Sequence, residues 1–257
     1  MRDGGTPQGR FAALAREDSR GAVVTVIGGP TTPGLGSKLL VLPDGTRQGS
    51  LGSPELDEEA ARHAEELMWA ERSEKRGPLF IDVTFPAPRL IIFGAIDFAA
   101  QLCTLARVSG WRPYVVDPRG FFARPDRFPD AEEVIAAWPD EAFERIGGID
   151  RATSIAVLTH DPKLDDAALK IALRSDAAYV GAMGSHRAQE KRRERMLALG
   201  FTDADLERLN APIGLDLGAL TPEETALSIM SEIVAHRRGR EGGRLAHVRG
   251  RIHEVVD

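Results

Sequence analysis

Cysteine is almost absent from this sequence: Cys103 is the only one among 257 residues. No intrachain disulfide can form, and a zinc site built on several thiolates is excluded. Free cysteines are often small core side chains, and we expect that role for Cys103, which lies inside a predicted helix. This usage is typical of a reducing compartment, so we expect an intracellular, cytoplasmic protein.

Long apolar runs and an excess of positive charge are lacking as well. No apolar stretch approaches the ~20 residues that cross a bilayer, and the amino terminus is polar, without the apolar core of a signal peptide. The formal net charge of −6 disfavours nucleic acid, because phosphate binding normally needs a positive surface. We therefore expect neither a membrane nor a nucleic-acid partner.

The composition is that of an ordinary globular protein, with 42% hydrophobic and 28% charged residues, and the length allows two domains. The prolines between Phe85 and Pro88 fix their own φ and restrict the residues before them, which predicts a stiff junction near Pro86. We expect an amino-terminal domain over residues 1–86, a carboxyl-terminal domain over 87–239 and a flexible tail over 240–257.

The first domain is predicted to be a small, partly antiparallel α+β unit. Ser53 as N-cap and Pro54 at the first helical position begin an amphipathic helix that reaches about Lys75. Residues 1–9 are polar and rich in glycine, which indicates a loose terminus. Short aliphatic runs closed by Gly and Pro turns predict strands over 22–27, 39–42 and 79–84.

The second domain alternates strands with helices, which is typical of an α/β fold with a Rossmann-like parallel sheet and helices on both faces. Residues 221–224 fit a capping box at the start of the last helix. The predicted strands cover residues 90–93, 113–116, 155–158 and 178–180, and the predicted helices cover 98–108, 131–138, 164–173, 188–199 and 221–237.

Two of these strands are followed directly by clusters of polar residues, one after Leu158 and one after Val180. Ligands of open parallel sheets bind beyond the carboxyl ends of the strands, so two neighbouring strand ends suggest one shared site. The second cluster could present backbone amides to an anion at a helix N-terminus, with Arg187 as a charged clamp. The candidates are Thr159, His160, Asp161 and Lys163 in the first cluster and Gly181, Gly184, Ser185 and Arg187 in the second.

A turn at Gly94 lies where a dinucleotide-binding loop belongs, between a strand and a helix, and Asp117 follows near the expected ~20-residue spacing. Ile96 replaces the glycine that would let a pyrophosphate approach, and Asp97 competes for the same amides. Conventional NAD(P) binding is therefore doubtful. A Rossmann-like turn that binds no dinucleotide and a modified phosphate site are equally good interpretations. Asp117 either binds a ribose or braces the turn that contains Arg119.

Four sequence blocks then carry a family resemblance: Val115 to Arg119, Leu158 to Asp166, Tyr179 to Ser185 and Pro212 to Gly218. With Pro33 to Leu39 and Gly49 to Gly52, they make the chain similar to the XdhC/CoxI family of xanthine dehydrogenase accessory proteins. The resemblance implies binding of the molybdenum cofactor, a molybdopterin, and its maturation and insertion. The implied partners are an apo molybdoenzyme of xanthine dehydrogenase type and a second copy in a homodimer, and a cysteine desulfurase is a further candidate.

The chain departs from the family pattern in two places. After Gly52, members commonly have two glycines, a cysteine and an acid, whereas this chain has Ser53, Pro54, Glu55 and Asp57. Members also carry Gly-Ala-Gly-His where this chain has Gly94 to Asp97. A paralogue that has lost its ligand is therefore one alternative.

Several residues keep two interpretations. His160 could bond to a pterin or a phosphate, shuttle a proton, or only orient its turn. Asp165 and Asp166 are favoured as helix stabilisers, and no metal is predicted from them. Asp216 either reaches the shared site beyond the two strand ends or only stabilises a turn. The basic residues Lys191, Arg192, Arg193 and Arg195 are expected to form a solvated face.

Three functions remain in competition. The first is a cofactor-binding and delivery factor, the second an NAD(P)-dependent oxidoreductase, and the third an adaptor without a ligand. No nucleophile with its base is visible, so we predict no catalytic residue. The predicted cofactor-binding residues are Gly94, Asp117, Arg119, Thr159, His160, Asp161, Lys163, Gly181, Gly184, Ser185, Arg187 and Asp216.

Overall fold

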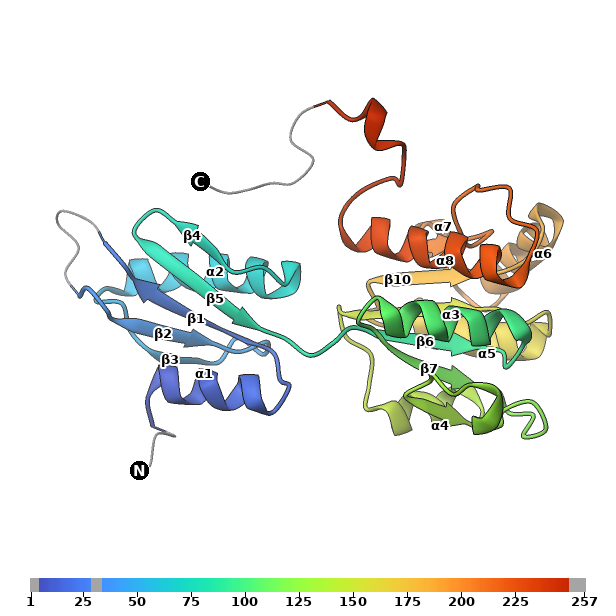
Figure 1. The fold of residues 1–257 in the computed structure, drawn as a ribbon, viewed down its shortest axis with the longest axis horizontal. Coiled ribbons are helices and arrows are strands. Elements are labelled where there is room, and N and C mark those ends of the chain that lie inside the picture. Colours follow the sequence, from blue (N-terminus) through green and yellow to red (C-terminus); the bar gives the residue numbers. More distant parts are fainter. Residues whose placement is uncertain (1–4, 29–33, 250–257) are drawn as a thin grey trace. The chain divides into compact units, whose positions relative to one another are not determined.

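The structure is a computed structural model that describes residues 5–28 and 34–249. Parts of the predicted terminus, of the glycine and proline turn after Ile27 and of the predicted tail lie outside the described residues. The described chain divides into two compact units next to Pro88, and we call them unit 1 and unit 2 (Figure 1). Each unit is described by itself.

Unit 1 is an antiparallel sheet with one helix on each face (Figure 1). Side chains alternate between the two faces of the central strand, so that Ala22 and Val24 pack with α2 while Val23 packs with α1. The strand order is β3-β2-β1-β5-β4. The elements are α1 (Pro7–Arg16), β1 (Gly21–Val26), β2 (Lys38–Val41), β3 (Arg47–Gly49), α2 (Pro54–Ala70), β4 (Glu74–Arg76) and β5 (Leu79–Thr84).

Two sequence predictions for unit 1 were wrong. The predicted loose terminus contains the start of α1, because Thr6 caps Pro7–Arg16 by accepting a hydrogen bond from the amide of Gly9. Helix α2 ends at Ala70 and not near Lys75, since Glu71 adopts a left-handed conformation at the C-cap. The residues beyond it form β4, which pairs with β5.

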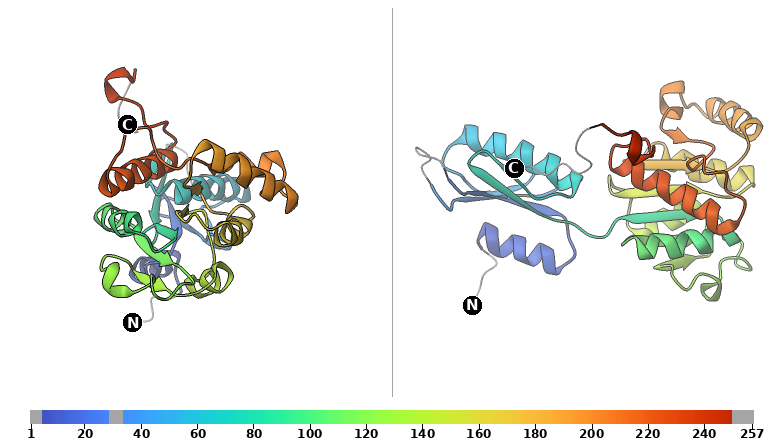
Figure 2. Two further views of the ribbon diagram at one scale, coloured as in Figure 1. Left: turned by 90° about the vertical axis from the view of Figure 1, so that its right-hand side faces the viewer. Right: turned by 45° about the horizontal axis from the view of Figure 1, so that its top comes forward.

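Unit 2 is a parallel six-stranded sheet with the order β11-β10-β9-β6-β7-β8, which confirms the predicted fold class. Figure 2 shows helices on both of its faces. Its strands are β6 (Arg89–Phe93), β7 (Arg112–Val116), β8 (Glu133–Ile135), β9 (Thr153–Val157), β10 (Tyr179–Ala182) and β11 (Leu209–Asn210).

Two helices of unit 2, α3 and α8, pack together over one apolar layer of the sheet, and α4, α5 and α6 contribute to the layer on the other face. Cys103 lies in the first layer, as predicted, and burial raises the pKa of its thiol to about 12. The helices are α3 (Asp97–Val108), α4 (Pro139–Ile146), α5 (Pro162–Ala172), α6 (His186–Ala198), α7 (Asp203–Leu206) and α8 (Pro222–Arg237), with 3₁₀ turns at Pro125–Arg127 and Leu245–His247.

The predicted helix over residues 131–138 was wrong. Glu133–Ile135 pairs in parallel with β7 as the edge strand β8, and the helix α4 begins only at Pro139. Proline suits the first turn of a helix, where its missing N–H leaves no bond unmade. The capping box predicted at Thr221 is present at the start of α8. Within the described residues, no helix is both long and apolar enough to cross a membrane.

Candidate functional site

The connections of unit 2 place a topological switch point between β6 and β9. From β6 the chain runs outward to β7 and β8, and it then returns to β9 on the other side of β6. At such a switch point the loops at the carboxyl ends of the two strands diverge, and ligands of open α/β sheets bind there. The turn at Gly94 follows β6. Leu158–Asp161, which we call the β9 loop, follows β9, and Met183–Ser185, the β10 loop, follows β10.

The Gly94 turn lies directly against the β9 loop. Gly94 has a φ of +111°, and a Cβ added there would lie 2.8 Å from Cγ2 of Thr159 and 3.2 Å from its amide nitrogen. Only glycine combines this backbone conformation with so close an approach. Gly94 is therefore required for packing, whether or not a ligand binds at this end of the sheet.

Asp117 is wholly buried, and its carboxylate is occupied by protein groups. It accepts hydrogen bonds from the amide of Ala95 at 3.0 Å and from the amide of Arg119 at 3.0 Å. The Arg119 guanidinium donates to it through Nε at 2.8 Å and Nη2 at 2.7 Å. Asp117 thus braces both the Gly94 turn and its own turn, which was one of its two predicted roles.

The charges around Asp117 favour its ionised form. Burial alone would raise the pKa of this carboxyl, but the hydrogen bonds from Arg119 and Ala95 outweigh burial and hold the pKa below its usual value. The hydrogen bond with Asp117 raises the pKa of Arg119, as does the charge of Asp161. Asp117 and Arg119 therefore form an ion pair at the end of β7, and Asp161 is near enough to act on Arg119 through its charge.

The β9 loop has a buried half and an exposed half. Thr159 is buried, and its hydroxyl donates to Asp165 while accepting the amide of Asp161 at 3.2 Å. Asp161 is the N-cap of α5 and accepts the amide of Lys163 at 2.9 Å. His160 and Lys163 are exposed. The exposed groups here are thus the imidazole of His160, the carboxylate of Asp161 and, in the first turn of α5, the ammonium of Lys163.

The β10 loop leads into a helix whose first turn is basic. Gly184 has a φ of +134°, and Ser185 caps α6 by accepting the amide of Ala188 at 3.3 Å. The first turn of α6 contains Arg187 and no acid. The partial positive charge of the helix terminus and the exposed Arg187 therefore have the same sign, which favours an anion at this place.

Gly181 lies inside β10 and is buried, two residues before the β10 loop. A Cβ there would lie 2.6 Å from Ile213 and from the hydroxyl of Tyr179. Close packing therefore explains why glycine occupies this position. The structure places this glycine beneath the surface of the candidate site.

Asp216 is exposed on the loop that joins β11 to α8. Glu232 of α8 holds this loop, because its carboxylate accepts the amide of Gly214 at 2.8 Å and the hydroxyl of Tyr179. Burial, followed by the hydrogen bond to Glu232, raises the pKa of Tyr179. Glu232 therefore fixes the base of the loop that displays Asp216.

Sequence reasoning missed three residues that support these loops: Arg127, Arg192 and Glu232. Arg127 donates through Nη1 to the carbonyls of Ala95 and Phe122, at 2.9 and 3.0 Å. Arg192 was predicted to be part of a solvated face, and that prediction was wrong, since its side chain is 4% exposed and pairs with Asp165. No local motif predicts these roles, because one main partner of each lies 18 to 32 positions away: Ala95 for Arg127, Asp165 for Arg192 and Gly214 for Glu232.

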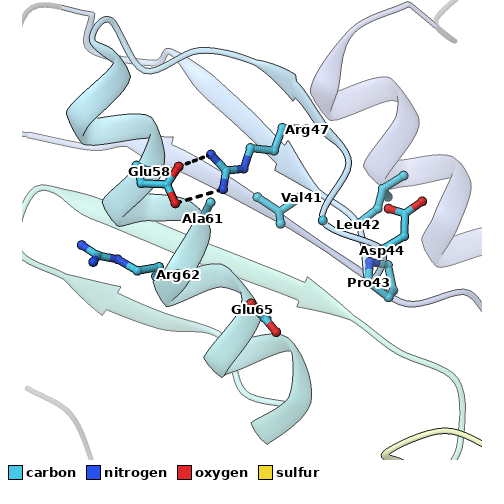
Figure 3. Close-up of a pocket in the computed structure, with 10 residues that line it drawn as sticks. Val41, Leu42, Pro43, Asp44, Arg47, Glu58, Ala61, Arg62 and Glu65 are labelled. Carbon is cyan, nitrogen blue, oxygen red and sulfur yellow. Dashed lines mark hydrogen bonds and ion pairs between the residues drawn. The ribbon is translucent and has the colours of Figure 1, made fainter.

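A hollow lies in unit 1, between the turn after β2 and the helix α2 (Figure 3). It has a volume of about 330 Å³ and a mixed lining of apolar and charged groups. Figure 3 shows Arg47 reaching Glu58 through two hydrogen bonds, at 2.7 and 3.3 Å. No predicted site residue lies here, and we assign the hollow no ligand.

The fold and these loops define the class of protein: a Rossmann-type α/β unit with polar loops at its switch point, preceded by an α+β unit. Residues 90–233 match the model of the XdhC Rossmann domain, and residues 14–77 match that of the XdhC and CoxI family. The chain belongs to the XdhC/CoxI family, which confirms the resemblance seen in its sequence.

Relatives of known name are similar to parts of this chain. A protein of Bacillus subtilis (strain 168), named as a probable subunit of xanthine dehydrogenase, is 29% identical over 160 residues, which are 62% of this chain and 46% of that protein. The molybdenum cofactor insertion chaperone PaoD of Escherichia coli (strain K12) is 25% identical over 156 residues, 61% of this chain and 42% of PaoD. The chain spans less than half the length of these curated relatives.

A solved structure has the same fold. It is described as a xanthine dehydrogenase from Bacillus halodurans, and the superposition has a TM-score of 0.62 at 25% sequence identity. The match covers 91% of this chain and 67% of that one.

Proposed function

We propose that this protein binds the molybdenum cofactor at the β9 and β10 loops and helps to insert it into an apoenzyme of xanthine dehydrogenase type. Family membership and the name of PaoD support the cofactor and the role. The observation that carries the site is that exposed basic side chains follow two neighbouring parallel strands, His160 and Lys163 after β9 and Arg187 after β10. A cytoplasmic location is part of this proposal.

The residues present fit the chemistry of the group. The cofactor is a phosphorylated pterin, so it needs donors for an anion and hydrogen bonds for a polar ring. The N-terminus of α6 with Arg187 offers the first, and the imidazole of His160 offers the second. When bound, the cofactor supplies the molybdenum chemistry of the client enzyme, and this chain binds and orients it.

The oxidoreductase alternative is less well supported by the Gly94 turn. A dinucleotide pyrophosphate would need the amides of this turn, but the amide of Ala95 already donates to the buried Asp117. Asp117 in turn has its oxygens occupied by Arg119, so a ribose would have to displace an ion pair. The role of a cysteine desulfurase partner and the homodimer remain predictions of the resemblance.

The test is to purify the protein from a host that makes the molybdenum cofactor and to assay released pterin fluorescence, metal and nicotinamide. Pterin and molybdenum without nicotinamide support the proposal. Nicotinamide with hydride transfer would support the oxidoreductase, and a protein with neither would point to the adaptor. Each outcome selects one of the three hypotheses.

We predict that His160→Ala and Arg187→Ala each lower pterin retention about tenfold, the effect of losing one charge-assisted hydrogen bond. Both side chains are exposed, so the unfolding midpoint should not change. Arg193→Ala is the matched control, because Arg193 is an exposed arginine further along α6 that pairs with Asp203. Equal retention in all three variants would rule out this site.

A further inference from the structure

A buried ion pair joins α5 to α6 behind the candidate site. Nη2 of Arg192 lies 2.8 Å from Oδ2 of Asp165, and both side chains are 4% exposed. The two residues stand 27 positions apart in the sequence, and the pair forms only because the two helices pack side by side.

Each member of the pair also holds one of the two loops. Asp165 accepts the hydroxyl of Thr159, whose oxygen in turn accepts the amide of Asp161 at 3.2 Å. Nη2 of Arg192 donates to the carbonyl of Met183 at 3.0 Å. An unbroken chain of hydrogen bonds therefore runs from the β9 loop to the β10 loop through this ion pair.

A second path strengthens the side of the β10 loop. Nη1 of Arg192 donates to the side-chain oxygen of Gln189, and the side-chain nitrogen Nε2 of Gln189 donates to the carbonyl of Gly184 at 3.1 Å. Arg192 thus holds two consecutive carbonyls of the β10 loop, one directly and one through Gln189.

Stability does not account for this pair. Burying two charges costs desolvation energy, and apolar residues of similar volume commonly serve a core equally well. Nε of Arg192 is buried without a partner among the described residues, which adds to the cost. What the ion pair offers and an apolar pair lacks is directional hydrogen bonds to both loops.

We propose that Asp165 and Arg192 are positioning residues that hold the β9 and β10 loops at a fixed separation, so that one ligand can contact both. The identity of that ligand as the molybdenum cofactor rests on the function proposed above. The positioning itself is a property of the free protein and can be measured without a ligand.

The test replaces the pair by apolar residues of similar size, in the double variant Asp165→Leu with Arg192→Met. We expect the unfolding midpoint to stay near that of the wild type. Amide hydrogen exchange of peptides covering the β9 and β10 loops should become about tenfold faster in the free protein, because loops released from these bonds open more often. Pterin retention should fall by a similar factor.

The chain provides a matched control in Asp166 and Arg195. This pair also joins α5 to α6, with Nε of Arg195 2.7 Å from Oδ2 of Asp166 and Nη2 3.0 Å from Oδ1. Its side chains are more exposed, at 19% and 34%, and its bonds run between the helices and not to the loops. Asp166→Leu with Arg195→Met should therefore leave exchange in both loops unchanged.

The proposal would be overturned if amide exchange in both loops of the first double variant stayed at the wild-type rate. It would also be overturned if exchange in these loops became equally fast in the control double variant. If the first double variant does not fold, Arg192→Lys decides, because lysine keeps the charge opposite Asp165 but lacks the planar fork that serves two acceptors. Unchanged exchange of the β10 loop in Arg192→Lys would overturn the proposal. A wild type that retains no pterin would defeat the proposed function while leaving the exchange comparison intact.

Discussion

Three carboxylates support the loops of the candidate site from behind. Asp117, Asp165 and Glu232 each accept hydrogen bonds from groups of a different loop or strand end. Asp117 and Asp165 are buried, so their charge acts on neighbouring protein groups and is not offered to solvent. At the scale of single residues, the structure therefore separates groups that shape the site from groups, such as His160, that face outward.

The role of Asp117 leads to a prediction about acid stability. Asp117→Asn should lower the free energy of unfolding at pH 7 by about 2–3 kcal/mol, because a charge-assisted network loses its acceptor. The folded-state pKa of Asp117 is depressed, so its contribution is fully present above the unfolded pKa of about 4 and is lost as pH falls through the folded value. Urea unfolding from pH 8 down to pH 2.5 measures the difference.

The gap between wild type and Asp117→Asn should stay constant above about pH 5 and should narrow below about pH 4. Asp44→Asn is the control, since Asp44 also has a lowered pKa but lies exposed in a turn of unit 1. A gap that persists at low pH would contradict the ionic account of Asp117.

Gly94 gives a second prediction at this scale. Gly94→Ala should destabilise the protein by about 2–4 kcal/mol, because a positive φ and a Cβ 2.8 Å from Thr159 act together. Gly77→Ala is the control, because Gly77 also has a positive φ, +57°, but open space around its Cβ. Its cost should be about 1 kcal/mol in the same denaturation experiment. Equal losses of unfolding free energy in the two variants would show that the contact with Thr159 does not contribute to the destabilisation.

At the scale of elements, caps and strand pairing decide where each segment begins and ends. Sequence patterns found most helices, because N-caps such as Ser53 and Thr221 are local signals. They failed for residues 131–138, where the short run Glu133–Ile135 gains its structure by pairing with β7. An edge strand of three residues has too little periodicity to be recognised before its neighbour is known.

The cap of α8 can be tested in isolation. Thr221→Ala should cost about 1 kcal/mol of unfolding free energy, because the threonine hydroxyl accepts the amide of Glu224. Thr202→Ala removes the same kind of capping box from α7, a helix of only four residues. Its cost should be smaller, since α7 contributes only the partly buried Leu206 to the apolar core of unit 2, and α8 contributes several buried residues. Thermal unfolding of both variants makes the comparison, and a larger effect at Thr202 would contradict it.

At the scale of the whole molecule, the two units have separate apolar cores. Unit 1 buries residues such as Leu67 and Ile81 between its sheet and α2, and unit 2 has one apolar layer on each face of its parallel sheet. Each unit therefore has an apolar core of its own, as an independently folding domain does.

Separate cores predict separate folding. Residues 88–250, expressed without unit 1, should unfold cooperatively and keep the fluorescence of Trp111, which is buried in unit 2. Calorimetry of the full chain should then show two transitions, one of which coincides with that of the isolated unit. A fragment without a cooperative transition would show that unit 2 needs unit 1 in order to fold.

The order and type of most elements, the parallel sheet, the strand ends followed by polar residues, and the family could all be predicted from the sequence. These features depend on periodicity, caps and spacing, which are local. The tertiary structure alone decided which polar residues support the site and which face solvent. Arg192 meets Asp165 across 27 positions, and Tyr179 meets Glu232 across 53, because helices pack beside one another and against the sheet. Helix packing brings these side chains together, and no local sequence pattern predicts an individual pair.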